Sequence, residues 1–252
     1  MNFLEKLNLL KNNLRELFKN KKVIVAYSGG IDSLLLSILL NNITEILCIF
    51  IKTPYISKWA LNNAIINAKK YNLNLKIVEV DKIIENVPER CYLCKKMFFE
   101  ILNKEKEYYS YDIIVDGTNY DDLFDDRPGL KAKKEFNIIS PLSDLKIRKK
   151  DIIEIAKYLN INHPPKETCL LTRFEFNRKI SIEDLRKIEC LEDFLRNYTN
   201  GAIRVRDFGD LAIIEVEKDF DKFIENKDNI VKKFKEFGYK KVCINLEEYM
   251  SY

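Results

Sequence analysis

The sequence has few of the features that would place it among membrane or dedicated nucleic-acid-binding proteins. No apolar run comes near the roughly 18 to 20 residues that a membrane helix needs. The 43 basic and 39 acidic residues leave a net charge of +4, less than a dedicated nucleic-acid-binding protein usually carries. The Lys-rich N-terminus contains glutamate and lacks the apolar core of a signal peptide. We therefore expect a cytoplasmic protein without a membrane partner.

Histidine is nearly absent, and cysteine is present in a pattern that suggests chemistry. Disulfides are rare in a reducing compartment, so clustered cysteines indicate a metal or catalytic site. Cys91 and Cys94 form a C-x-x-C at the start of an expected helix, and Cys169 is a good third candidate. A structural zinc site normally has four protein ligands, and His163 is the only histidine. Three cysteines instead suit a [4Fe–4S] cluster with one iron left open.

Three further cysteines lie outside this pattern. Cys48 and Cys243 fall in expected strands and Cys190 in an expected helix. A cysteine in such a place is usually a small buried apolar side chain. We expect no chemical role for them.

Alternating short apolar runs and amphipathic segments predict an α/β fold. After an amphipathic helix over residues 3–19, the expected strands are 22–27, 44–51, 75–80, 111–116 and 137–139, and the expected helices are 32–41, 57–71, 91–106 and 148–159. Strands separated by helices indicate a parallel sheet covered on both faces. The chain is long enough to bury a sizeable core, as one large or two small domains.

A boundary follows at His163, because the two prolines after it break the pattern. We expect one domain over residues 1–163 and a smaller α+β domain over 164–252. In the second domain the expected elements are a helix over 181–197, strands over 202–206 and 211–216, a helix over 219–236 and a strand over 240–246.

Residues 28–33, Ser-Gly-Gly-Ile-Asp-Ser, follow the first strand directly and precede the first helix of the alternating pattern. Two glycines allow a tight turn close to a ligand, and the N–H groups of the next helix favour an anion. Asp32 either caps the helix or holds a phosphate-bound Mg²⁺. The segment lacks the lysine of a G-x-x-x-x-G-K-[ST] loop. It resembles the signature of the PP-loop ATP pyrophosphatases, which cleave ATP between its α- and β-phosphates.

A wider set of motifs resembles one family within that group, the ATP-dependent sulfur transferase LarE. The motifs are residues 28–33, 88–95, 116–119, 126–132, Cys169 with Arg173, and 204–206. The resemblance runs through both domains to Gly238 and Tyr239. It implies that the protein adenylates the carboxylate of a pyridinium dicarboxylate mononucleotide and converts it to a thiocarboxylate. It also implies that residues 1–163 bind ATP and that residues 164–252 carry substrate and sulfur-transfer residues.

The resemblance also implies roles for individual residues. Pyrophosphate of ATP is expected on Ser28, Gly29, Gly30, Asp32 and Ser33, with Mg²⁺ near Asp32, and the nucleotide pocket on Gly117 and Thr118. Lys95 is expected at the acyl-adenylate or α-phosphate, and Arg204 and Arg206 at a substrate phosphate or carboxylate. Glu192 and Glu215 match carboxylates that line the family's sulfur site, and Arg127 is expected in a loop that closes over substrate or serves as a loop anchor.

The family has two sources of sulfur. In one, the cysteine at the position of Cys169 is sacrificed; in the other, three cysteines bind a [4Fe–4S] cluster whose open iron carries a labile sulfide. Cys91 and Cys94 beside Cys169 resemble the cluster type. ATP, Mg²⁺ and the cluster are therefore the expected cofactors, and a nucleotide-like carboxylate, a sulfide donor and further copies of the chain the expected partners.

Three other interpretations of the same residues stay open. A tRNA thiolase also combines the loop with three cluster cysteines, but usually adds an RNA-binding module or a basic face. An amide-forming ligase of the NAD or GMP synthetase type shares the loop without needing the cysteines. A zinc-stabilised nucleotide-binding module needs a fourth ligand, and the sequence offers no clear one.

Overall fold

The computed structural model describes residues 3–124, 129–163, 165, 167–247 and 249. The chain forms two compact units. The first unit contains Met1–Lys52, Leu61–Val80 and Glu89–Pro164, and the second contains Thr53–Ala60, Asp81–Pro88 and Pro165–Tyr252. Two short segments from within the first half of the chain thus belong to the second unit.

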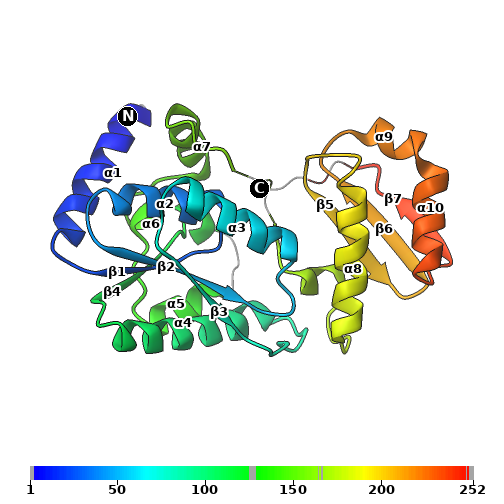
Figure 1. The fold of residues 1–252 in the computed structure, drawn as a ribbon, viewed down its shortest axis with the longest axis horizontal. Coiled ribbons are helices and arrows are strands. Elements are labelled where there is room, and N and C mark those ends of the chain that lie inside the picture. Colours follow the sequence, from blue (N-terminus) through cyan, green and yellow to red (C-terminus); the bar gives the residue numbers. More distant parts are fainter. Residues whose placement is uncertain (1–2, 125–128, 164, 166, 248, 250–252) are drawn as a thin grey trace. The chain divides into compact units, whose positions relative to one another are not determined.

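The first unit is built on a four-stranded parallel sheet with the order β3-β2-β1-β4 (Figure 1). Its strands are β1 (Val23–Ala26), β2 (Ile46–Lys52), β3 (Leu75–Glu79) and β4 (Ile113–Asp116). Ala26 pairs with Asp116 in the register of the central strands, so the two loops that follow these residues begin side by side. The expected α/β fold with a parallel sheet is confirmed.

Helices cover both faces of this sheet (Figure 1). They are α1 (Phe3–Phe18), α2 (Ile31–Asn41), α3 (Lys58–Lys70), α4 (Arg90–Tyr108), α5 (Gly129–Glu135), α6 (Pro141–Asp144) and α7 (Lys149–Tyr158), with a short 3-10 turn η1 (Asp121–Leu123). Ile24 and Ile49 of the sheet pack with Phe99 and Leu102 of α4 in one buried cluster. Burial of this apolar surface is the main force that holds α4 against the strands.

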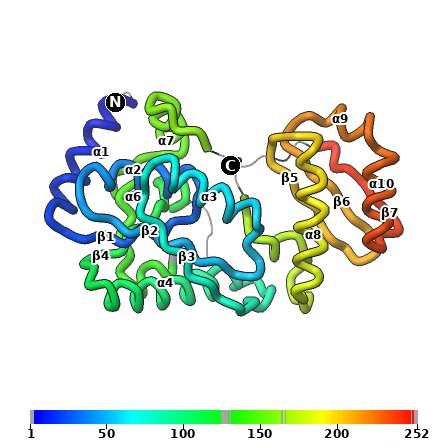
Figure 2. The backbone as a smooth tube through the Cα atoms, viewed as in Figure 1, coloured from blue at the N-terminus to red at the C-terminus, as the bar shows by residue number. Residues whose placement is uncertain are grey.

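The second unit is a three-stranded mixed sheet with the order β5-β6-β7. Its elements are η2 (Leu170–Arg173), α8 (Ile182–Leu195), β5 (Ile203–Phe208), β6 (Leu211–Val216), α9 (Phe220–Glu225), α10 (Lys227–Glu236) and β7 (Lys241–Ile244). Strands β5 and β6 are antiparallel, and β6 and β7 are parallel. Figure 2 shows the long connection through α9 and α10 that makes this parallel pairing possible.

The segment over residues 53–60 is part of this second unit through specific contacts. The Leu170 N–H donates to the Tyr55 carbonyl at 2.8 Å, and the guanidinium of Arg196 lies 3.9 Å from the centre of the Trp59 ring. The segment over 81–88 is tied in a similar way, because the Asn86 side chain donates to the Glu175 carbonyl at 2.7 Å.

Two expected elements differ from the structure. The predicted helix over 219–236 is divided at Asn226, whose side chain donates to the Lys222 carbonyl at 2.8 Å and ends α9. Asparagine competes for backbone groups in this way, which favours a helix end. The predicted strand over 137–139 is reduced to one bridge, between Ile139 and Val115.

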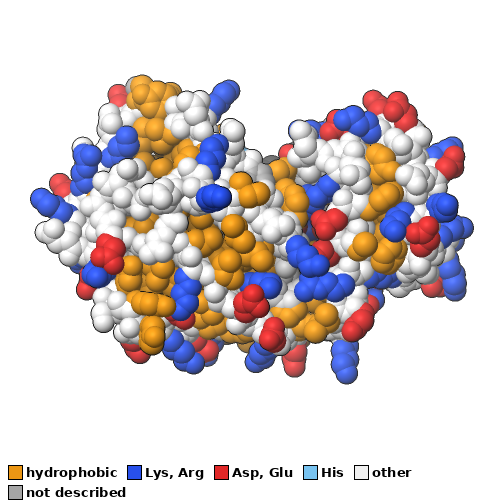
Figure 3. Space-filling view, in the orientation of Figure 1, with side chains coloured by type: hydrophobic (Ala, Val, Ile, Leu, Met, Phe, Trp, Pro, Cys, Tyr) orange, Lys and Arg blue, Asp and Glu red, His pale blue; other side chains and the backbone are white. Residues whose placement is uncertain are grey.

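On the visible face of the molecule, positive and negative side chains are interspersed (Figure 3). This mixture agrees with the small net charge of +4. Among the described residues, no helix has both the length and the apolar character that a membrane crossing requires.

Candidate functional site

The loop between β1 and α2 is shaped to bring backbone close to a ligand. Gly29 has φ of 76°, and a Cβ at this position would lie 2.7 Å from the Ala64 Cβ. Only glycine meets both conditions. Gly30 follows in an extended conformation and precedes the first turn of α2, where helical N–H groups have no partner within the helix.

Two serine hydroxyls fix the loop from inside. The Ser33 hydroxyl donates to the Gly30 carbonyl at 3.1 Å and accepts from the Ser28 N–H at 3.2 Å. The Ser28 and Ser33 hydroxyl oxygens are 3.1 Å apart. Ser28 and Gly30 are exposed while Ser33 is buried, so the loop has a rigid inner side and an open outer side.

Asp32 carries an oxygen that lacks a hydrogen-bond partner in the described part of the chain. Its Oδ2 pairs with the Lys149 ammonium at 2.7 Å, whereas its Oδ1 is buried and makes no hydrogen bond. A buried carboxylate oxygen without a donor is costly unless a ligand completes it. The residues therefore fit a nucleotide phosphate with Mg²⁺, and Asp32 would face the cation.

The loop after β4 is packed directly against the start of α2. A Cβ at Gly117 would lie 2.6 Å from the Ser33 backbone nitrogen. The next residues are held by the Asp116 carboxylate, which accepts from the Thr118 N–H at 3.1 Å, from the Thr118 hydroxyl at 2.7 Å and from the Ser140 hydroxyl. Gly117 and Thr118 thus form a fixed wall beside the Ser28–Ser33 loop.

The C-x-x-C lies at the start of α4, with Cys91 in its first turn and Cys94 at the beginning of its second. Cys91 is exposed and Cys94 is half-buried, and the Tyr92 hydroxyl between them donates to the Glu135 carboxylate at 3.0 Å. The stem of Lys95 passes close to Gly129, where a Cβ would lie 2.6 Å from the Lys95 Cδ. Helix α5 therefore holds the cysteine turn from one side.

Cys169 lies in the second unit, immediately before η2. The turn that carries it is bound by the guanidinium of Arg173, which is 1% exposed. Arg173 pairs with Glu192 at 2.7 Å and with Glu167 at 2.7 Å. Burial disfavours the charged guanidinium, but the charge of Glu192 and its hydrogen bonds raise the pKa of Arg173 above its ordinary value.

Glu192 is 2% exposed and fully engaged by the protein. Its Oε1 accepts from the Val205 N–H at 2.9 Å as well as from Arg173 Nε. Burial raises the pKa of this carboxyl, but the charge and hydrogen bonds of Arg173 outweigh it and hold the pKa below the usual value. Glu192 therefore stays ionised inside the unit.

The two arginines of β5 lie in different surroundings. Arg204 is fully buried, 3.7 Å from Glu167 and with its guanidinium 4.9 Å from the centre of the Tyr249 ring. Burial and the charge of Arg173 lower the pKa of Arg204. Arg206 is partly exposed and pairs with Glu215 at 2.8 Å. Of the two, Arg206 offers the more accessible guanidinium for an anion.

Comparison with known proteins supplies the family. No family model matches the chain. It is 77% identical over its whole length to an uncharacterized protein of Methanocaldococcus jannaschii, which it covers completely. It is 30% identical to an uncharacterized protein of Synechocystis, over 95% of this chain and 94% of that protein. The chain belongs to the same family as these two proteins.

Two named relatives place this family in a larger group. The pyridinium-3,5-bisthiocarboxylic acid mononucleotide synthase of Lactiplantibacillus plantarum is 28% identical over 92% of this chain and 88% of its own length. A glutamine-hydrolyzing GMP synthase chain of Thermoplasma volcanium is 29% identical over 47% of this chain and 41% of its own length. This is the PP-loop ATP pyrophosphatase superfamily.

The sequence did not predict two charged residues that the structure places at these positions. Lys149 pairs with Asp32 of the PP-loop, and Glu167 pairs with Arg173, Arg196 and Arg204. In the sequence, nothing distinguishes Lys149 or Glu167 from an ordinary charged surface residue. Lys149 and its partner Asp32 are 117 residues apart in the chain, so no local signal could have revealed the pair.

The expectation that Cys190 and Cys243 are buried is wrong, because both are exposed. Cys48 is buried as expected. Cys190 lies on the outer side of α8, and Cys243 lies on β7, the edge strand, where alternate residues face solvent. Burial raises the pKa of the Cys48 thiol to about 11, which makes it unreactive.

The candidate cysteines of the PP-loop protein are divided between the units. Cys91 and Cys94 are in the first unit and Cys169 is in the second. No group of three or more metal-binding side chains is gathered among the residues that the structure describes. Arg127 lies outside the described residues.

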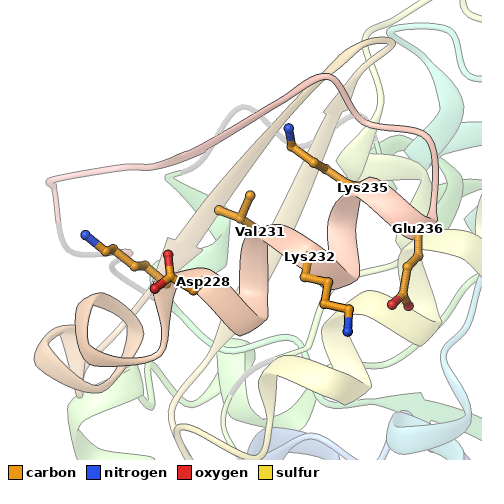
Figure 4. A pocket seen from close by; sticks show the side chains of 6 residues that line it. Asp228, Val231, Lys232, Lys235 and Glu236 are labelled. Carbon is orange, nitrogen blue, oxygen red and sulfur yellow. The ribbon is translucent and has the colours of Figure 1, made fainter.

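A surface hollow lies on α10, in the second unit, whereas the PP-loop belongs to the first unit. The hollow is lined by Lys227, Asp228, Val231, Lys232, Lys235 and Glu236. Figure 4 shows these side chains extending from a single helix, with Val231 and Lys235 on one side and Lys232 and Glu236 on the other. Such a one-sided surface offers no enclosed place for a small molecule.

Proposed function

We propose that this PP-loop protein is an ATP-dependent sulfur transferase of the LarE type. Its substrate would be a carboxylate attached to a nucleotide-like group, such as a pyridinium dicarboxylate mononucleotide. The observation that carries the proposal is the presence, in one chain, of a PP-loop with an orphaned Asp32 oxygen and of the cysteines Cys91, Cys94 and Cys169. The 28% identity to the bisthiocarboxylic acid mononucleotide synthase over most of both chains supports it.

The chemistry follows from the poor reactivity of a carboxylate. A carboxylate oxygen attacks the α-phosphorus of ATP, the bond to the β-phosphate oxygen breaks, and pyrophosphate leaves with Mg²⁺. Sulfide sulfur then attacks the acyl carbon, AMP leaves with the former carboxylate oxygen, and a thiocarboxylate remains. The protein contributes mainly by holding the reactants close and by stabilising the charge on the leaving groups.

The first unit provides the groups for adenylation. The N–H groups at the start of α2 and the Ser28 hydroxyl would bind the pyrophosphate, while Asp32 would orient its Mg²⁺. Gly117 and Thr118 would border the nucleotide. Lys95, whose stem rests on Gly129, would place a positive charge at the α-phosphate or the acyl-adenylate.

Sulfur would come from a [4Fe–4S] cluster bound by Cys91, Cys94 and Cys169. Such a cluster with three protein ligands supplies an open iron that can hold a sulfide. This ligand set is proposed from the types of donor and from the resemblance to LarE. Arg206 would bind a phosphate or carboxylate of the acceptor.

The alternative is an amide-forming ligase, because the GMP synthases share the PP-loop. Their similarity covers about half of this chain, whereas the similarity to the bisthiocarboxylic acid mononucleotide synthase covers 92% of it. An amide-forming ligase also has no need of the three cysteines, so the sulfur transferase is the better proposal.

The decisive experiment is anaerobic purification followed by iron and acid-labile sulfide analysis. We expect about four irons and at least about four sulfides per chain, and their loss in Cys91→Ala, Cys94→Ala and Cys169→Ala. Cys190→Ala is the matched control, because Cys190 is exposed but lies on the outer side of α8. The control should retain the metal.

Other results would redirect the assignment. Iron that is lost from the Cys91 and Cys94 variants but kept in Cys169→Ala would contradict the three-cysteine cluster. Stoichiometric zinc, or no metal, would leave a sacrificial Cys169 or an amide-forming ligase as the better account. Thiolation of tRNA by a cluster-loaded protein would show that the acceptor is a nucleic acid.

A further inference from the structure

The guanidinium of Arg173 donates hydrogen bonds to residues on both sides of Cys169 in the turn that carries it. Arg173 Nη1 donates to the Thr168 hydroxyl and to the Thr172 hydroxyl, each at 2.7 Å. Arg173 Nη2 donates to Glu167 at 2.7 Å. Thr168, immediately before Cys169, and Thr172, three residues after it, are therefore bound to the same rigid, planar group.

No N–H of this guanidinium is left over. The remaining two donate to Glu192, Nε to Oε1 at 2.7 Å and Nη2 to Oε2 at 3.1 Å. An arginine has five N–H donors in a fixed fork, and all five have acceptors here. Complete satisfaction of a buried charged group defines a single geometry for the groups around it.

Glu192 links the cysteine turn to β5 by hydrogen bonds. It lies on α8, and its Oε1 also accepts from the Val205 N–H at 2.9 Å. Val205 stands between Arg204 and Arg206 in the strand. A second link runs in parallel, because Arg206 Nη1 donates to the Thr172 carbonyl at 2.5 Å.

We propose that Arg173 and Glu192 are positioning residues, which hold the Cys169 turn at a fixed place relative to Arg206. The inference rests on the proposed function for the importance of Cys169, but the geometry stands without it. Glu192 acts by holding other residues in place, because both of its carboxylate oxygens already accept hydrogen bonds from N–H groups of the protein. The pair sets how far the Cys169 sulfur stands from an acceptor bound at Arg206.

A role in positioning explains why charges are buried at all. Taking an ion pair out of water costs free energy that well-packed apolar side chains would not incur. Apolar side chains of similar volume would stabilise the unit but would not define the distance between the turn and the strand. The fork of Arg173 and the two oxygens of Glu192 do define it.

Local hydrogen exchange on the full chain, followed by mass spectrometry, separates positioning from general stability. The variants are Arg173→Lys, which keeps the charge but not the fork, and Glu192→Gln, which keeps the shape but not the charge. The control is Arg186→Lys, since Arg186 pairs with Glu189 on α8 of the same unit and, among the described interactions, contacts no residue of 167–174. Three segments are compared: 167–174, 203–206 and 226–236.

In both variants we expect exchange over 167–174 to accelerate by about tenfold or more, because charged hydrogen bonds that close the turn are lost. Exchange over 226–236 should stay within about twofold of wild type. Arg186→Lys should leave exchange over 167–174 unchanged. Unchanged exchange over 167–174 in the folded variants, or equal acceleration in all three segments, would overturn the proposal. Neither result depends on iron, ATP or sulfur transfer.

Discussion

At the scale of single residues, the PP-loop is determined by contacts that permit no side chain. A Cβ added to Gly29 would lie 2.7 Å from Ala64, and one added to Gly117 would lie 2.6 Å from the Ser33 backbone. The sequence predicted these glycines from their place after a strand. It could not predict Lys149, because a lysine pairs with whichever carboxylate the fold brings to it.

Gly117→Ala tests the contact between the two loops. The added Cβ would lie 2.6 Å from a backbone nitrogen that cannot move without α2, so we expect a loss of about 1–3 kcal/mol in the free energy of unfolding. Urea denaturation measures it. Gly201→Ala is the control, because its Cβ meets the flexible Lys218 side chain, and it should change the value by less than about 0.5 kcal/mol. Equal losses in both variants would contradict the account.

Lys149→Met tests the role of the lysine beside Asp32. Without its ammonium, the unpaired Asp32 charge repels phosphate, and we expect about tenfold weaker binding of a non-hydrolysable ATP analogue, measured by calorimetry. The free energy of unfolding should change by less than about 1 kcal/mol, because the pair is partly exposed. Lys150→Met is the control at the next, exposed position. If both variants bind the analogue equally well, Lys149 has no part in the site.

At the scale of elements, sequence periodicity predicted most helices and strands but not how they are joined. The expected helix over 91–106 corresponds to α4, and the expected strands over 202–206 and 211–216 correspond to β5 and β6. The division of 219–236 at Asn226 was missed, because one asparagine side chain competing with the helix is a weak local signal. The sequence also did not predict that β5 continues to Phe208. Asp207, near the end of the strand, is held by hydrogen bonds from Tyr239 and Arg178 that form only in the folded unit.

Asp207 makes the second unit sensitive to acid. Burial raises the pKa of this carboxyl, but hydrogen bonds from Tyr239 and Arg178 outweigh that and lower it. A lowered folded-state pKa gives stability that is present above the unfolded value of about 3.9 and is lost as pH falls through the folded value. In Asp207→Asn we expect a smaller loss of unfolding free energy below about pH 4, measured by urea denaturation across pH. The exposed Asp210→Asn should retain the wild-type slope, and an unchanged slope in Asp207→Asn would refute the assignment.

At the scale of the whole molecule, the chain crosses between its two units repeatedly. It crosses after residues 52, 60, 80, 88 and 164. The sequence predicted a boundary at the prolines after His163, but nothing in its composition separated residues 53–60 or 81–88 from their neighbours. Their assignment depends on partners such as Glu189, which accepts from the Lys58 N–H at 2.5 Å.

A fragment of residues 1–163 should therefore differ from the full chain in the fluorescence of Trp59. Trp59 is the single tryptophan, and in the fragment it loses Arg196, with which it stacks. We expect its fluorescence emission to shift to longer wavelength, because the ring becomes exposed to water, and urea unfolding of the fragment to be less cooperative. Arg196→Lys in the full chain is the control for loss of the stacked guanidinium alone. A fragment with the full chain's emission maximum would show that residues 53–60 are held by the first unit.

The same crossings have a consequence for how the protein is made. A ribosome releases the chain from its N-terminus, so Trp59 emerges 137 residues before Arg196, its stacking partner. At about 5–20 residues per second, the residues that complete its unit are synthesised roughly 7 to 30 s later. The parallel sheet can assemble in that interval, while residues 53–60 and 81–88 still lack the contacts that they make in the second unit. Chaperones that bind exposed aromatic side chains would bind this segment during the interval, which ends once α8 and Arg196 have been synthesised.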